Sequence, residues 1–386
     1  MCQAAPLLRQ IAPQGEHEGR PAGEVGAVQP QPVPPRRAQG ARSKVVLLGT
    51  AGGGNPKKER AGYANAVVVD DVAYVIDCGE GVHRQLWRAG IAMNRGRTPR
   101  GGATVRALFL THLHADHVID IANLFLGFWP THEISVYGPG PAGLPIPAYP
   151  PDSTPPPLFR PEEPTPGTAA MLQHLLAAYA YNINVRIADE GRSDLTRHIA
   201  VREIGVTSDD HRPDIDLGIT ASGASAEEAA PPMEPVEIYP TDDRGVRVTA
   251  ILVQHAPVFP ALAYRFDTPE GSVVFSGDTG PCDNVARLAR DADILVHEVI
   301  DLEWMESRIS TNLPNREAVL SHLAVAHTTP DQAGAIATKA NVGTLVLSHL
   351  VPGDDDLTNE EWEAKTRPHF AGSLMCGRDL DELALG

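Results

Sequence analysis

The sequence predicts an α/β fold in which two mixed β-sheets pack face to face and are flanked by helices. Short apolar runs alternate with amphipathic segments along the chain, and this order is typical of layered α/β domains. No stretch of sequence repeats another, which fits two packed β-sheets flanked by helices. Polar side chains also follow several of the apolar runs directly, where α/β folds place their sites.

The first half of the chain supplies a set of strands and one helix. Asp70 and Asp71 separate two apolar runs, which predicts a β-hairpin. The run over 105–110 leads straight into a cluster of histidines, and the segment over 119–129 after it has a helical pattern. The strands expected here cover 45–48, 66–69, 73–76, 105–110 and 134–137.

The second half repeats the alternation after an irregular stretch. We expect helices over 169–181, 284–289 and 330–339. The expected strands cover 246–253, 261–266, 272–275, 294–296 and 344–347.

Proline-rich segments set the domain organisation. Residues 1–43 are rich in Pro, Gly, Gln and Ala and are expected to form a disordered or loosely packed tail. Residues 44–386 are then expected to form one domain, with a Pro-rich insertion at about 140–235. Within it, the stretches 141–166 and 221–235 are expected to be irregular, and the insertion is expected to cover the pocket.

Charge and composition narrow the range of partners. The formal net charge is −17, and the basic stretches at 36–42 and 57–60 are short, so a nucleic-acid partner is not expected. No apolar run of about 18 residues is present, so no membrane span is expected. The start lacks the pattern of an export signal, which favours a cytoplasmic location. The cysteines are not paired in spacing, which argues against disulfides and a thiolate zinc site.

The strongest chemical signal is the run His112-Leu-His114-Ala-Asp116-His117. It places four good ligands for Zn²⁺ or a related ion at the end of a strand. Side chains alternate along an extended segment, so His112 and His114 point the same way, while Asp116 and His117 begin the next helix. The alternative is a histidine-rich surface loop. Its position between an apolar strand and an apolar helix argues against that alternative.

Three more ligand candidates each follow an apolar strand. They are His255, Asp278 and His349. Taken singly, each is more often a structural polar group than a metal ligand. Together with the histidine run they favour a metal centre.

These motifs resemble the metallo-β-lactamase superfamily, in the branch of ribonuclease Z and the zinc arylsulfatases. The resemblance covers most of the chain from 44 to about 352, apart from the insertion. It implies the αββα sandwich of that family. The segments that carry it are Leu47-Leu-Gly-Thr-Ala, Asp77-Cys-Gly-Glu-Gly, the histidine run, Val136-Tyr-Gly-Pro-Gly, Gly277-Asp-Thr-Gly, Val296-His-Glu, His327-Thr-Thr-Pro and Leu347-Ser-His.

The resemblance implies two zinc ions per chain, and Mn²⁺ or Fe²⁺ would suit the same ligands. One ion is held by residues that match His112, His114, His255 and Asp278. The other is held by residues that match Asp116, His117, Asp278 and His349, so that Asp278 bridges the pair. Such a pair lowers the pKa of a shared water and neutralises charge on the attacked group.

Residues around the ligands receive supporting roles by the same resemblance. Asp116 and His327 are the expected catalytic residues, with His327 as general acid or transition-state stabiliser. The alternative for His327 is a structural residue before a helix capped by Thr329. From its place at the end of the strand over 73–76, Asp77 is expected to orient a metal-binding histidine. His297 and Glu298 follow a buried strand and are expected to be supporting or structural residues and not ligands.

Departures from ribonuclease Z decide the predicted substrate. Only 22 residues separate His255 from Asp278, which leaves no room for the tRNA-gripping arm of that family. Three aspartates at 354–356 follow the last ligand. We therefore expect hydrolysis of a small-molecule ester such as an aryl sulfate, phosphodiester or lactone, with a homodimer compatible with the sequence. The alternatives are a ribonuclease Z-type tRNA 3′-processing endoribonuclease and, more remotely, a non-catalytic metal-binding protein.

Overall fold

The computed structural model describes residue 38 and residues 40–386 apart from 95, 97, 100, 144–145, 147–156, 209–210, 221–225 and 355. Residues 32–386 belong to one compact unit. Most of the expected tail over 1–43 lies outside the described residues. No helix in the described part of the chain is long and apolar enough to cross a membrane.

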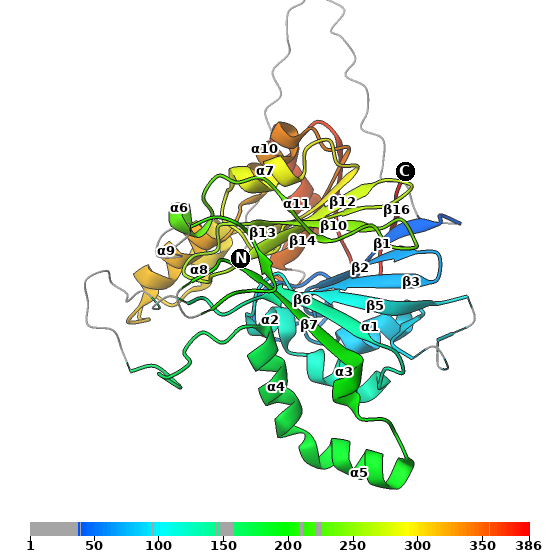
Figure 1. The fold of residues 1–386 in the computed structure, drawn as a ribbon. Helices are drawn as coiled ribbons and strands as arrows, with labels where there is room; N and C mark the ends of the chain where they lie inside the picture. The colour runs from blue at the N-terminus through cyan, green and yellow to red at the C-terminus, as the bar shows by residue number, and fades with distance from the viewer. Residues whose placement is uncertain are drawn as a thin grey trace, which may run out of the picture. The chain divides into compact units, whose positions relative to one another are not determined.

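The first sheet is built mainly from the first half of the chain (Figure 1). The expected hairpin is present as β2 and β3, which pair antiparallel and turn at Asp70, whose backbone is left-handed with φ 53°. The sheet has the order β16-β1-β2-β3-β5-β6-β7-β8, with β4 beside β5. Its strands are β1 Ser43–Gly49, β2 Ala64–Val69, β3 Val72–Ile76, β4 Ile91–Ala92, β5 Ala103–Phe109, β6 Ile134–Pro139, β7 Ile199–Gly205, β8 Ile215–Asp216 and β16 Glu382–Ala384.

The second sheet has the order β15-β14-β13-β12-β11-β10-β9. Strands β12, β13, β14 and β15 are mutually parallel, whereas β9 to β12 are antiparallel neighbours. Its strands are β9 Val236–Tyr239, β10 Arg247–Leu252, β11 Leu262–Asp267, β12 Ser272–Phe275, β13 Ile294–Ile300, β14 Thr344–Val351 and β15 Ser373–Cys376.

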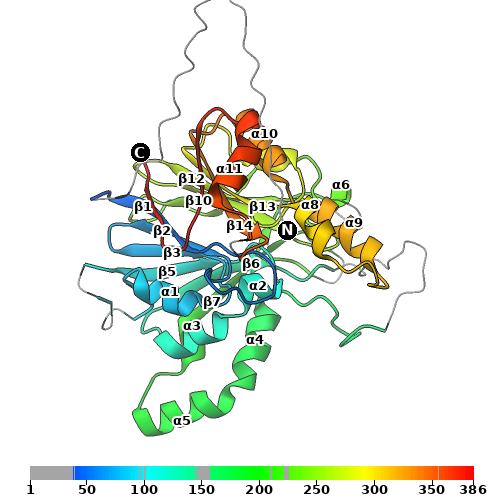
Figure 2. The same ribbon diagram turned by 180° about the vertical axis from the view of Figure 1, so that it is seen from behind.

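Aromatic side chains fill the space between the sheets. Phe109 from the first sheet stacks on Tyr137 and meets Tyr264 and Phe266 of the second sheet edge-on, with ring centroids 5.0, 5.7 and 5.1 Å away. Helices cover the outer faces (Figures 1 and 2), so the expected αββα sandwich is confirmed. On the first sheet lie α1 Val82–Arg88, α3 Ile121–Phe128 and α4 Thr168–Ala178. On the second lie α7 Asp283–Leu288, α10 Pro330–Ala340 and α11 Asn359–Thr366.

Several elements were not expected from the sequence. Strand β7 lies within the predicted insertion, yet it pairs with β6 and extends the first sheet. Helix α5, which was not expected, lies at an angle to the expected helix α4 and away from the sheets (Figure 1). Whether the insertion covers the pocket stays a prediction. The other additions are α2 Ala115–Val118, α5 Ala180–Glu190, α6 Ala226–Ala229, α8 Leu302–Arg308, α9 Arg316–Ala326 and the short 3₁₀ turns Leu195–His198 and Arg367–His369.

Candidate metal centre

The topology brings the seven predicted ligands to one edge of the sandwich. Strands β3, β5 and β6 are parallel, and β12, β13 and β14 are parallel, so the residues at their carboxyl ends gather at common edges. The histidine run follows β5, and His255 and Asp278 follow β10 and β12. His349 lies inside β14, where its φ of 45° interrupts the regular strand geometry. All seven side chains fall into two groups able to hold a metal ion.

The first group consists of His112, His114, His255 and Asp278. The His255 Nε2 lies 3.2 Å from the His114 Nδ1. The Oδ2 of Asp278 lies 3.9 Å from the His112 Nε2 and 4.0 Å from the His255 Nε2. The ligand atoms therefore surround a small space without filling it.

The second group consists of Asp116, His117, Asp278 and His349. Here it is the other oxygen of Asp278, Oδ1, that lies 3.2 Å from both the His117 Nε2 and the His349 Nε2. The Asp116 Oδ2 completes the group at 3.4 Å from the His349 Nε2. Asp278 thus turns one oxygen to each group, which is the geometry of a carboxylate that bridges two ions.

Unpartnered polar atoms support a metal at both positions. The Nε2 atoms of His112 and His117 and the Oδ1 of Asp278 are buried and have no hydrogen-bond partner among the described residues. Buried polar atoms are rarely left unpaired, because the loss of water is costly. Burial lowers the pKa of His255 to about 3 and lowers that of His112, which keeps both imidazoles neutral and able to bind a metal. The residues fit a pair of divalent ions.

The predicted supporting residue Asp77 contacts a ligand directly. Its Oδ2 lies 2.9 Å from the His117 Nδ1. Its two oxygens also accept bonds from the backbone N–H and the hydroxyl of Thr111, at 2.7 and 2.9 Å. A carboxylate in this position fixes the ring of a metal-binding histidine and increases its basicity.

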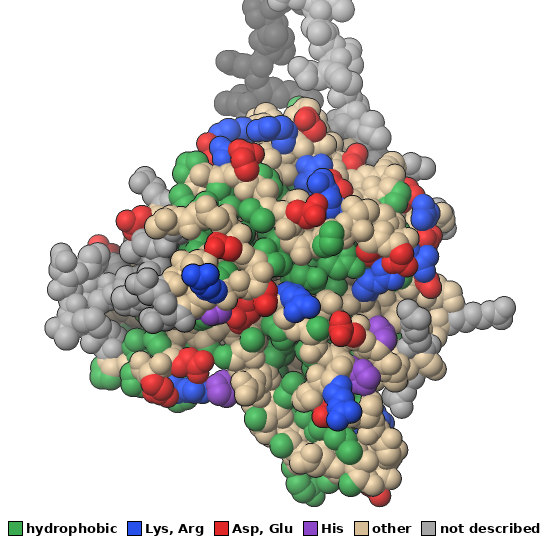
Figure 3. Space-filling model, viewed as in Figure 1, with side chains coloured by type: hydrophobic (Ala, Val, Ile, Leu, Met, Phe, Trp, Pro, Cys, Tyr) green, Lys and Arg blue, Asp and Glu red, His purple; other side chains and the backbone are tan. Residues whose placement is uncertain are grey.

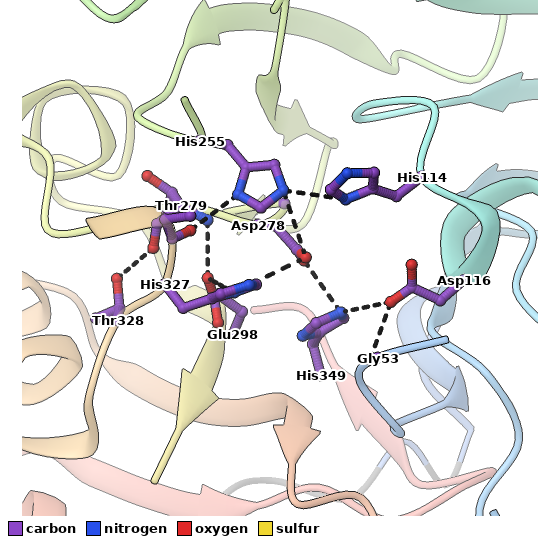
Figure 4. A network of polar contacts seen from close by, with 12 residues as sticks. Gly53, His114, Asp116, His255, Asp278, Thr279, Glu298, His327, Thr328 and His349 are labelled. Carbon is purple, nitrogen blue, oxygen red and sulfur yellow. Dashed lines mark hydrogen bonds and ion pairs between the residues drawn. The ribbon is translucent and has the colours of Figure 1, made fainter. Parts of the chain in front are cut away.

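Main-chain groups hold two further ligands, His255 and Asp116. The His255 Nδ1 lies 2.9 Å from the carbonyl oxygen of Ala326, at the end of α9. The backbone N–H of Gly53 donates to the Asp116 Oδ2 at 2.9 Å (Figure 4). A Cβ on the neighbouring Gly52 would lie 2.5 Å from the His349 Nδ1, so a glycine is needed there.

His327 and Glu298 form a buried pair beside the ligands (Figure 4). The His327 Nδ1 lies 3.0 Å from the Glu298 Oε1 and 3.9 Å from the Asp278 Oδ2. Burial disfavours the charge on His327, but the Glu298 carboxylate outweighs it and raises the pKa of His327 to about 9. His327 is therefore cationic near neutral pH, and its Nε2 forms no hydrogen bond with another described residue.

His297, the third predicted supporting residue, has a different environment. It neighbours Glu298 on β13, where side chains alternate between the two faces of the sheet. Its Nδ1 lies 2.8 Å from the Glu298 backbone carbonyl, and its Nε2 has no partner among the described residues. In the described part of the chain, the His297 imidazole forms no hydrogen bond or ion pair with a metal ligand.

Three residues near the centre were not identified from the sequence. Thr111 ties Asp77 to the histidine run, and its place directly before that run was the available signal. Tyr63 packs its ring 5.3 Å from those of both His117 and His349. His322, on α9, lies 6.3 Å from the rings of His255 and His327. No motif surrounds Tyr63 or His322 in the sequence.

Family models match two segments of the chain. Residues 60–182 match the metallo-β-lactamase superfamily model, and residues 200–350 match a β-lactamase superfamily domain. The chain is 30% identical to ribonuclease Z of Mycobacterium bovis (strain BCG / Pasteur 1173P2) over 343 residues, covering 87% of this chain and 96% of the relative. It is 31% identical to ribonuclease Z of Mycobacterium avium (strain 104) over 341 residues, with the same coverage.

Two solved structures share the fold. Human tRNase Z, short form, has a TM-score of 0.51 at 18% identity, covering 89% of this chain and 99% of that one. The metallo-β-lactamase fold protein YhfI from Bacillus subtilis also has a TM-score of 0.51 at 18% identity, covering 88% and 98%.

The relatives correct the expected substrate. The prediction of a small-molecule ester substrate with no nucleic-acid partner is wrong, because nearly full-length relatives at 30% identity are ribonucleases. The physical error lay in treating the net charge of −17 as decisive. At physiological ionic strength, exposed charges are screened beyond about 8 Å, so a distant acidic surface does not exclude RNA from a site.

The activity class follows from the same relatives and from the two ligand groups. The chain is a metal-dependent hydrolase that acts on ester bonds, which removes the alternative of a non-catalytic metal-binding protein. It belongs to the ribonuclease Z family of the metallo-β-lactamase superfamily.

Proposed function

We propose that this chain is an endoribonuclease that hydrolyses a phosphodiester bond in precursor tRNA during 3′ processing. The observation that carries the proposal is the match to ribonuclease Z along 96% of that relative's length. The seven candidate ligands, which form two groups that share Asp278, agree with it, since a pair of metal ions can stabilise both the attacking and the leaving oxygen of a phosphodiester.

The proposed metals are two zinc ions per chain, bound in the groups that share Asp278. Imidazole and carboxylate ligands favour zinc, and manganese or iron would suit the same atoms. When bound, such ions activate a water molecule and neutralise charge on the phosphodiester. Asp116 is proposed to act both as a ligand and as a catalytic residue, held in place by the N–H of Gly53.

His327 is proposed as the general acid. Glu298 accepts from its Nδ1 and keeps the ring charged, so that its Nε2 can donate a proton to the leaving oxygen. Glu298 is fixed in turn by the backbone N–H of Thr279, which donates to its Oε1 at 2.8 Å. Asp77 is proposed to act through His117, by holding the ring in its ligand orientation. A cytoplasmic location stays a prediction.

A cleavage assay tests the proposal. The purified chain, supplied with zinc or manganese, should cut a precursor tRNA that carries a 3′ extension, and the product ends should be mapped. The matched control is the Asp278→Ala variant, which retains the RNA-facing surface but lacks the shared ligand. Failure of the metal-loaded wild-type chain to cut any precursor tRNA would contradict the proposed function.

A further inference from the structure

One stretch of the chain has a charge opposite to that of the whole. From residue 81 to residue 111 there are six arginines and no Asp, Glu or Lys, in a chain with a net charge of −17. The arginines are spread over the stretch and form no contiguous basic cluster. They are Arg84, Arg88, Arg95, Arg97, Arg100 and Arg106.

Part of this positive charge lies on one exposed face of helix α1. Arg84, Trp87 and Arg88 are all exposed on α1, at positions that lie on the same side of a helix. The opposite side of α1 buries Val82 and Leu86 against the first sheet. Trp87 is 52% exposed, which is unusual for the largest apolar side chain.

The arginines of this face are available to a partner. Arg88 donates to the side-chain oxygen of Gln85, and neither Arg84 nor Arg88 forms an ion pair with any described residue. Arg106 differs, because it is engaged by Asp242 and Asp243. The remaining arginines, at 95, 97 and 100, lie outside the described residues.

Few acidic residues lie next to α1 in the described part of the chain. Asp379, which is partly buried, accepts from the Gln85 side chain on α1 at 2.9 Å. The neighbouring helix α3 contains no charged residue and exposes Asn123. Asp120, between them, is buried, and its carboxylate accepts from the backbone N–H of His83 and from Asn123, at 2.7 and 2.6 Å. The exposed acid nearest in sequence is Glu80, just before α1. On the face shown in Figure 3, by contrast, acidic and basic side chains are interspersed.

The segment that leads into α1 lies beside the metal centre. The segment before α1 is joined to the histidine run, since the N–H of Cys78 donates to the His117 carbonyl at 2.7 Å. A hollow of about 280 Å³ lies beside the ligand Asp116. Its wall includes Gly53, Lys57, Ile119 and Glu80, and α1 starts two residues after Glu80. The hollow therefore lies between the ligand Asp116 and the segment that leads into α1.

We propose that Arg84, Trp87 and Arg88 form an RNA-binding surface on α1. The inference rests on the proposed function and specifies which part of the chain holds the RNA. The two guanidinium groups bind backbone phosphates, and the indole ring stacks on an unpaired base or against a ribose. This surface supplies contacts that the 22-residue connection between His255 and Asp278, occupied by β11, β12 and their turns, does not provide.

Salt-dependent binding tests the arginines. The probe is a fluorescently labelled tRNA without a 3′ extension, so that cleavage does not disturb the measurement. The double variant Arg84→Ala/Arg88→Ala should bind more weakly. The slope of log affinity against log salt should be smaller in magnitude by roughly 1.4 to 1.8, as expected for two lost phosphate contacts. Thermal unfolding and metal content of each variant check that the fold and the centre are intact.

The matched control removes the same charge elsewhere. Arg290 and Lys339 are exposed on the helix layer of the second sheet, and Arg290→Ala/Lys339→Ala lowers the net charge equally. This variant should bind tRNA with wild-type affinity and slope. Equal effects of the two double variants would show that only overall charge matters and would overturn the proposal.

Trp87 gives a separate test. Trp87→Ala should weaken tRNA binding roughly 5- to 150-fold with an unchanged salt slope, and Trp87→Phe should retain most of the affinity. Loss of a dimer in light scattering with unchanged tRNA affinity would instead make this face a contact between two copies, and the proposal would be wrong. Cleavage of precursor tRNA by the wild-type chain is measured in parallel. Cleavage with no effect of the α1 variants refutes this surface alone, whereas the absence of both binding and cleavage refutes the proposed function as well.

Discussion

The two sheets contribute to the metal centre in different ways. The first sheet supplies four ligands from one stretch of six residues after β5, whereas the second supplies His255 and Asp278 from the segments after β10 and β12 and His349 from within β14. Ligands that are contiguous are positioned by local geometry. Those from β10, β12 and β14 meet only because the parallel arrangement of strands brings their ends together. One half of the centre is thus encoded locally, and the other half depends on the fold.

The residues that orient the ligands differ in the same way. In the first sheet, the carboxylate of Asp77 faces His117. The carboxylates of Asp278 and Asp77 together raise the pKa of His117, although burial opposes the increase. In the second sheet, His255 is oriented by the neutral carbonyl of Ala326. A positive charge at the His117 ring is therefore stabilised before any metal binds, whereas His255 is neutral. We infer that the two groups respond differently when their supporting residues are changed.

The largest expected effect comes from the one residue that belongs to both groups. Asp278→Ala removes an oxygen from each, so metal content should fall from about two ions per chain and cleavage should be abolished. Elemental analysis of the purified protein together with a cleavage assay measures both. His83→Ala is the control, because His83 packs on Phe128 away from the ligands, and both metal and activity should be kept. If the wild-type chain bound only one ion under metal-replete conditions, the prediction of two separate metal-binding groups would be contradicted.

Removal of the proposed general acid should slow the reaction without loss of metal. We expect His327→Ala to reduce turnover roughly 10²- to 10⁴-fold. The reduction should be smaller for a synthetic nitrophenyl phosphodiester, whose leaving group needs little protonation. The measurement is kcat on both substrates, with elemental analysis of the variant. An equal reduction on both substrates would assign His327 a structural role.

The contrast between the sheets also explains what could be predicted from the sequence. The histidine run could be identified from spacing alone, because period-two alternation and a following helix determine where its side chains point. The roles of His255, Asp278 and His349 required a resemblance, since no local pattern links residues so far apart. Helix α9 was missed because only Ala326 on it is buried, so it has no strong amphipathic pattern. Strand β16 has three residues, too few to give an alternation.

The substrate was mispredicted for a related physical reason. Net charge is a sum over the chain, but binding depends on the field within a short distance of a surface. Six arginines without neighbouring acids between residues 81 and 111 were present in the sequence. Two of them, Arg84 and Arg88, lie on α1, and their exposure depends on which side of that helix packs on the first sheet, which became visible only in the fold.

A moderate effect is expected from the supporting carboxylate of the first sheet. Asp77→Asn keeps the shape of the side chain but removes the charge that faces His117, so the affinity for one ion should fall about 10- to 100-fold. Titration with a competing chelator measures the affinities of the two ions separately. The other ion, in the group with His255, should be bound with nearly its original affinity. Equal weakening of both ions would mean that the two groups form one cooperative unit.

The smallest expected effect is a shift in pH dependence. Glu298 raises the pKa of His327 to about 9, so the protonated acid is present below that pH and is lost as the pH rises through it. Turnover of a substrate with a poor leaving group should therefore decline on the alkaline side. Glu298→Gln removes the carboxylate but keeps a hydrogen-bond acceptor, so the decline should begin at a lower pH. The pH profile of kcat for the two proteins tests this. If kcat declined at the same pH in the wild-type chain and in Glu298→Gln, Glu298 would position His327 but would not set its charge.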